Sequence, residues 1–158
     1  MSSSVSMAPA SADLDCSRTQ IDPRGPRFGA SVTTVVLAAA LILNGTTAGT
    51  VLIAWQTLVF ALGAIVGLQA QPYGVFFRKV IKPRLGPPAE MEDAAPPRFA
   101  QAVGLAFLVV ALGAALLGAT VVAAVAVAFA LAAAFLNAVF AFCLGCEMYV
   151  LGQRLAHR

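Results

Sequence analysis

Two long stretches without a charged residue constrain this sequence more than any other feature. No Asp, Glu, Lys or Arg occurs in residues 28–77 or in residues 99–146, which are runs of 50 and 48 residues. A helix needs about 20 residues to cross a hydrocarbon core of about 30 Å. Each run is therefore long enough for two crossings and a turn.

The crossings are expected to be α-helices. Backbone amides cannot stay unpaired in lipid, so a chain crosses a membrane as helices or as a closed barrel. Both runs are continuously apolar and rich in Ala and Leu, without the period-two alternation of barrel strands. Turn-forming residues divide the runs at 44–47 and at 118–120. The sequence therefore predicts an all-α integral membrane protein, a four-transmembrane-helix bundle.

The domain boundaries follow from this division. The expected spans are residues 28–44, 50–68, 99–117 and 121–144. They belong to a transmembrane domain at 21–158, which includes a cytoplasmic loop at 69–98. Residues 1–20 are small and polar and lack the basic start and apolar core of a signal peptide, so they are expected to form a disordered cytoplasmic tail.

The cations set the orientation. All ten Lys and Arg residues fall on one side of the four spans, and the two turns on the other side carry none. These ten are Arg18, Arg24, Arg27, Arg78, Lys79, Lys82, Arg84, Arg98, Arg154 and Arg158. The positive-inside bias makes that side cytoplasmic, so both termini are expected there.

A short repeat opens the first and third spans. Residues 26–32 read PRFGASV and residues 97–103 read PRFAQAV, so each copy places Pro, Arg and Phe in the same order at a helix start. Two independent helix-start motifs explain the match as well as a true repeat does. A true repeat would make the two hairpins parallel.

The central loop has two parts. Residues 73–82 mix aromatic and aliphatic residues with cations, which predicts a short interfacial helix that Pro83 ends. We expect residues 73–84 to lie on anionic headgroups, as a simple anchor rather than a site for nucleic acid. Residues 87–97 are acidic and proline-rich, which indicates an extended linker or a docking strip.

A Cys-x-x-Cys pair ends the last apolar run. On a helix that continues to its end, Cys143, Cys146 and Glu147 stand at i, i+3 and i+4 and share one face. The two cysteines are then close enough for a disulfide. Gly145 lets a partner backbone or a substrate approach them. The pair is expected at the cytoplasmic interface, where soluble carriers can reach it.

The expected electrostatics do not activate these thiols. A helix C-terminus and the Glu147 carboxylate both disfavour a thiolate, although Arg154 and the basic loop offset them. Glu147 is a candidate for moving protons to and from the thiols. The alternative interpretation is that Cys143 and Cys146 are small apolar residues that only pack.

Cys16 adds a third thiol on the tail, within reach of the Cys-x-x-Cys pair because the intervening chain extends about 40 Å. Three roles are open for it: a resolving thiol, a third metal ligand, or none. Zinc held by Cys16, Cys143, Cys146 and His157 is the metal alternative, but its ligands come from a mobile tail and a chain end. No cofactor motif is present, so neither zinc nor quinone is expected from the residues.

Several segments resemble the bacterial membrane family DUF4395. They are residues 22–28 (DPRGPRF), the loop from Pro72-Tyr73-Gly74 to Pro88, residues 97–99, and the closing FCxGCxxY at 142–149. The closing motif is the most specific of them, and Cys16 resembles an upstream cysteine that many members carry. Similar members are encoded near thioredoxin-like and sulfurtransferase genes. The resemblance implies redox or sulfur handling at a bacterial cell (inner) membrane.

Two functions are therefore expected as competitors. The first is a membrane thiol redox or sulfur-relay component, in which Cys143 and Cys146 exchange with a thioredoxin-like or rhodanese-like soluble partner. Four-helix membrane oxidoreductases that pass electrons to quinone are an analogy of fold alone. The second function is a non-enzymatic scaffold or small transporter subunit with structural cysteines.

Overall fold

Four long helices form the body of the protein. The structure, a computed structural model, describes residues 20–88 and 90–156. Its long helices are α1 (Arg24–Ile42), α2 (Thr47–Ala61) with its π-helical continuation η1 (Leu62–Val66), α4 (Ala95–Leu116) and α5 (Thr120–Phe140). Each is long and apolar enough to cross a membrane. The expected all-α membrane bundle is confirmed, and the protein is a multi-pass membrane protein.

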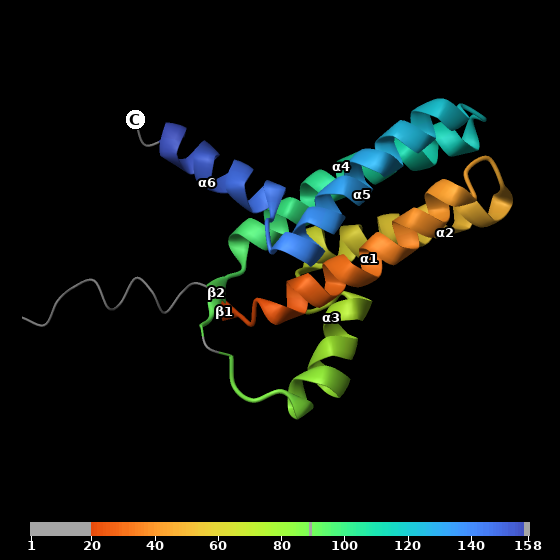
Figure 1. The fold of residues 1–158 in the computed structure, drawn as a ribbon. Helices are drawn as coiled ribbons and strands as arrows, with labels where there is room; N and C mark the ends of the chain where they lie inside the picture. The colour runs from red at the N-terminus through yellow and green to blue at the C-terminus, as the bar shows by residue number, and fades with distance from the viewer. Residues whose placement is uncertain (1–19, 89, 157–158) are drawn as a thin grey trace, which may run out of the picture.

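The bundle consists of two hairpins that lie against each other (Figure 1). Their turns use Gly45 and Gly118, both with positive φ, near the two positions where the sequence predicted turns. Thr46 caps α2 by accepting a hydrogen bond from the Gly49 amide at 3.1 Å. The Asn44 side chain donates to the Thr120 carbonyl at 3.0 Å and so joins the two turns.

Small residues let the helices approach closely. Helix α5 packs against both α1 and α4, and α2 packs against α1 and α4. The fully buried core combines Leu37, Ile53 and Leu108 with alanines such as Ala111 and Ala126. Small side chains at helix contacts are typical of membrane bundles. In lipid the hydrophobic effect does not drive helices to associate, so close packing must hold them together.

Two shorter helical segments lie at the end of the bundle opposite the hairpin turns (Figure 1). The first comprises α3 (Pro72–Phe76), η2 (Phe77–Ile81) and η3 (Lys82–Arg84), and the second is α6 (Leu144–Ala156). The expected helix in the central loop is therefore present. The described cations, from Arg24 to Arg154, all belong to this charged end, as their sorting in the sequence predicted.

The repeated motif has a structural counterpart. Phe28 of the first copy stacks on Phe76, with ring centroids 5.9 Å apart, and also contacts Phe77. Phe99 of the second copy contacts Tyr149 of α6 at 5.7 Å. Each hairpin is thus followed by a short helical segment that packs back on the first helix of that hairpin. The two halves of the chain therefore have the same order of elements, as expected for two hairpins related by a parallel repeat.

A short ladder and an ion pair hold the start of α1 against the central loop. Strand β1 (Gln20–Ile21) pairs antiparallel with β2 (Glu92–Asp93), so residue 20 belongs to the ordered fold and not to the tail. Asp22 is buried and accepts two hydrogen bonds from the Arg24 guanidinium, at 3.0 and 2.9 Å. These bonds lower the pKa of Asp22, which keeps its carboxylate charged.

Polar side chains cross-link the helices within the apolar region. Gln56 is fully buried; its amide donates to Thr33 Oγ1 on α1, and its carbonyl oxygen accepts from Tyr73 Oη on α3, both at 3.0 Å. Gln71 donates to Gln101 on α4 at 2.6 Å. A side-chain amide within lipid must find a partner, and these bonds between helices supply one for Gln56 and for Gln71.

Candidate functional site

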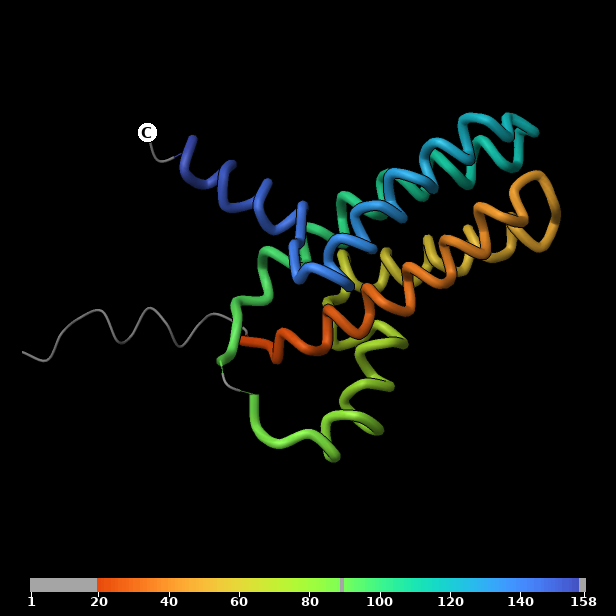
Figure 2. Tube along the Cα trace, viewed as in Figure 1, coloured from red at the N-terminus to blue at the C-terminus, as the bar shows by residue number. Residues whose placement is uncertain are grey.

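The Cys-x-x-Cys pair lies where the chain leaves the fourth span. Helix α5 ends at Phe140, four residues before the expected boundary, and Ala141 adopts a left-handed conformation with φ 55°. The chain then turns sharply into α6 (Figure 2). Cys143 directly precedes α6, and Cys146 lies in its first turn. The expectation that Cys143, Cys146 and Glu147 continue the fourth span is wrong, because a separate helix begins between the two cysteines.

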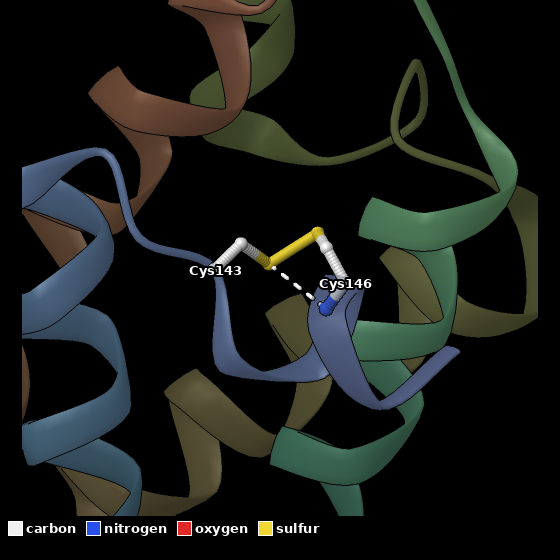
Figure 3. The surroundings of a disulfide bond; sticks show 2 residues. All are labelled: Cys143 and Cys146. Atoms are coloured by element: carbon white, nitrogen blue, oxygen red, sulfur yellow. Dashed lines mark hydrogen bonds between the residues drawn. A yellow bond between two sulfur atoms is a disulfide. The ribbon is translucent and has the colours of Figure 1, made fainter. Parts of the chain in front are cut away.

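The two cysteines face each other. They form a disulfide in the structure, and their Cα atoms are 5.2 Å apart (Figure 3). The backbone N–H of Cys146 donates to Cys143 Sγ at 3.3 Å. The proximity expected from the spacing is therefore present, although it arises from a helix start and not from consecutive turns of one helix.

This location reverses the expected electrostatics. Free N–H groups and the positive end of the helix dipole lie at the start of α6, and both stabilise a thiolate. The Cys146 N–H already points at the Cys143 sulfur. The C-terminus of a continuous fourth span, where the pair was expected, would have disfavoured the thiolate. The structure thus makes Cys143 the better placed of the two sulfurs to carry negative charge.

Gly145 fixes the start of α6 against α4. It is buried, and a Cβ atom at this position would lie 2.5 Å from both the Cα and the Cβ of Ala100. A side chain here is incompatible with that separation. The close approach expected at Gly145 is present, and the approaching group is the backbone of the chain's own third span.

Glu147 lies in the first turn of α6, next to Cys146. Its backbone N–H donates to the Cys143 carbonyl at 3.0 Å, which belongs to the first turn of α6. The side chain is exposed, and within the described residues its carboxylate forms no hydrogen bond or ion pair. An acidic residue in a first turn stabilises the helix. The role of Glu147 in proton transfer stays a prediction.

A cavity of about 280 Å³ opens beside Cys143. It is lined by α1, α2, α4, α5 and the start of α6, and its walls are mainly apolar. Phe60, Phe107 and Phe129 supply aromatic wall, and Phe107 and Phe129 stack with ring centroids 5.8 Å apart. Cys143 lines this cavity, whereas Cys146 does not. The cavity could not be predicted from the sequence, because residues from five separate helices line it.

Asn137 supplies a polar side chain to this mainly apolar cavity. It lies on α5, a span without any charge, and it lines the cavity together with Cys143. In the part of the chain that the structure describes, its side-chain amide has no hydrogen-bond partner. An amide in this position can bond to a ligand in the cavity.

The remaining predicted ligands lie outside the described residues. These ligands are Cys16 and His157, and the structure does not place either of them relative to the Cys-x-x-Cys pair. Within residues 20–88 and 90–156, no group of three His, Cys, Asp or Glu side chains could hold a metal ion. The zinc alternative, which needs both Cys16 and His157, therefore stays untested.

Comparison with known protein families identifies a match. Residues 21–154 match the family described as Domain of unknown function (DUF4395), which covers the whole bundle and the Cys-x-x-Cys segment. No curated protein and no solved structure matches the chain.

Proposed function

The chain belongs to the DUF4395 family, and from the Cys-x-x-Cys pair at the start of α6 we propose that it is a membrane thiol redox or sulfur-relay component. The proposal rests on one observation at the N-terminus of α6. Cys143 and Cys146 form a disulfide there, and the Cys146 N–H donates a hydrogen bond to Cys143 Sγ. That arrangement provides a dithiol that can close, and it stabilises one thiolate over the other.

In the redox form of the proposal, a soluble thioredoxin-like dithiol reduces the pair. A partner thiolate attacks Cys143 Sγ, the Cys143–Cys146 bond breaks, and Cys146 leaves as a thiolate that takes up a proton. The second partner thiol then attacks the mixed disulfide, which releases Cys143 and leaves the partner oxidised. Two electrons and two protons reach the pair. Glu147, exposed one residue after Cys146, is the nearest candidate for moving those protons.

The sulfur-relay form uses the same nucleophile. The Cys143 thiolate attacks the outer sulfur of a rhodanese-like persulfide, takes that sulfur, and returns the partner cysteine as a thiolate. Attack by Cys146 on Cys143 then closes the disulfide and releases hydrosulfide. Both forms need the pair at the charged end of the bundle, where a soluble protein can approach. The positive-inside bias favours the cytoplasm, in a bacterial cell membrane, as that compartment.

Thiol trapping tests the proposal against a scaffold with structural cysteines. Membranes carrying the full chain are treated with a large maleimide before and after a mild oxidant, and the mass shift counts free thiols. We expect the number of labelled cysteines to fall by two on oxidation and to recover with a thioredoxin-like reductant. A Cys16→Ser background assigns the change to Cys143 and Cys146. A pair that never changes state would contradict the proposal and favour the scaffold.

We also propose that the helical segment from α3 to η3 binds anionic headgroups. Lys79, Lys82 and Arg84 are exposed at the charged end of the bundle, and Phe77 and Phe76 hold this segment on Phe28 of α1. Each exposed cation contributes about 1 kcal/mol near an anionic surface. Replacing all three with Gln is expected to reduce the retention of anionic lipid, measured by native mass spectrometry. The same change at Arg154 alone is the control, and equal retention in the triple variant would contradict the proposal.

A further inference from the structure

The cavity beside Cys143 has the properties of a site for a lipid-soluble ligand. It lies among the spans and is bounded by aromatic and small apolar side chains. A cavity of about 150 Å³ is enough for a benzene ring, so about 280 Å³ accommodates a ring with several substituents. A ligand can reach this position from the bilayer interior or from the membrane interface.

Two features point to the chemistry of that ligand. Of the two cysteines, Cys143 lines the cavity, and a dithiol that closes must deliver two electrons and two protons. Asn137 lines the same cavity, and its side-chain amide, which has no partner in the described residues, can donate a hydrogen bond to a carbonyl. An apolar ring with carbonyl oxygens that accepts two electrons and two protons is a quinone.

We propose that this cavity binds the ring of a membrane quinone, which reoxidises the Cys143–Cys146 dithiol. The inference rests on the proposed redox function and names its electron acceptor. In the step, the two S–H bonds break and one S–S bond forms. The quinone gains two electrons and two protons, and its two carbonyl oxygens become hydroxyls. Phe107 and Phe129 offer flat surfaces to the ring, and Asn137 orients one carbonyl.

The experiment uses the full chain in lipid nanodiscs. The disulfide is reduced, the reductant is removed, and ubiquinone-1 is added; its fully substituted ring resists direct addition of thiols. Quinone absorbance and maleimide-reactive thiols are followed together. We expect one quinone reduced for each pair that closes, and no reaction faster than background in a Cys143→Ser, Cys146→Ser variant. Wild-type protein that reduces the quinone no faster than this control would overturn the inference.

Two variants locate the reaction in the cavity. Ala133 lines the cavity, whereas its neighbour Ala132 is exposed on the outer face of α5, so Ala133→Phe fills the site and Ala132→Phe is the matched control. Ala133→Phe should slow quinone reduction about tenfold or more, and Ala132→Phe should not. Asn137→Leu should raise the quinone concentration for half-maximal rate about three- to tenfold, as expected for one lost hydrogen bond. Equal rates in Ala133→Phe and Ala132→Phe would overturn the cavity assignment.

Failure of the inference is distinguishable from failure of the proposed function. The same nanodiscs are mixed with a reduced thioredoxin-like protein, without quinone, and disulfide exchange is measured. Exchange in both Ala133→Phe and wild type, with slow quinone reduction only in Ala133→Phe, supports the inference. Exchange in wild type without quinone reduction refutes the inference and leaves the redox function standing. Absence of both reactions refutes the redox function and the inference with it.

Discussion

A Cys146→Ser variant is expected to accumulate a stable mixed disulfide between Cys143 and a thioredoxin-like partner. The wild-type adduct is short-lived, because the Cys146 thiolate can attack Cys143 and expel the partner. Serine removes that nucleophile but keeps the backbone N–H that donates to Cys143 Sγ at 3.3 Å. The partner is a thioredoxin-like protein whose second cysteine is replaced by Ser, so that it cannot release Cys143. Non-reducing gels of membranes incubated with this protein and a mild oxidant should show an adduct that a reductant dissolves.

The converse variant supplies the control. Cys143→Ser removes the sulfur that the helix N-terminus and the Cys146 N–H stabilise, so it is expected to form little adduct. A Cys146→Ser protein that forms no adduct would contradict the assignment of Cys143 as the nucleophile. More adduct through Cys146 than through Cys143 would reverse the two roles. Both variants are made with Cys16→Ser, so that the tail thiol cannot act in place of either.

The number and grouping of the spans could be predicted because lipid imposes simple constraints. A charge-free run must cross in whole helices, and its length fixes how many crossings fit. The turns near Gly45 and Gly118 carry flexible residues that signal them. An unpaired amide is costly in lipid, so Gln56 needs partners there, but the sequence does not identify Thr33 and Tyr73 as those partners.

The break before Cys143 could not be predicted, because the sequence around it carries no helix-ending signal. Residues 138–144 contain neither Gly nor Pro, and apolar residues there read as a continuing span. A left-handed Ala141 is unfavourable by about 1–2 kcal/mol, so contacts elsewhere must stabilise it. The packing of α6 on α4, with Gly145 against Ala100, supplies such contacts. Tertiary packing therefore decided the local conformation and, with it, the electrostatics of the site.

Gly145→Ala is expected to loosen α6 from α4 and to disorder the site. The added methyl would overlap Ala100, where a Cβ would lie 2.5 Å from backbone and side-chain carbons. Overpacking of this kind costs about 1–3 kcal/mol. The free energy of unfolding should fall by that amount in a reversible detergent titration. Maleimide labelling of the reduced pair should accelerate, because Cys143 and Cys146, both partly buried, become more exposed.

Gly152→Ala is the matched control on the same helix. No atom lies within 4 Å of a Cβ at Gly152, so the substitution should be neutral or stabilise α6 by about 0.5–1 kcal/mol through helix propensity. Adding Ala100→Gly to Gly145→Ala removes one of the two clashing carbons and should restore part of the lost stability. Such a rescue would show that Gly145→Ala acts through the contact between α4 and α6, and not through a local change in the backbone between the two cysteines. If Ala100→Gly restores nothing, or if Gly152→Ala costs as much as Gly145→Ala, the contact between α4 and α6 does not position the Cys-x-x-Cys pair.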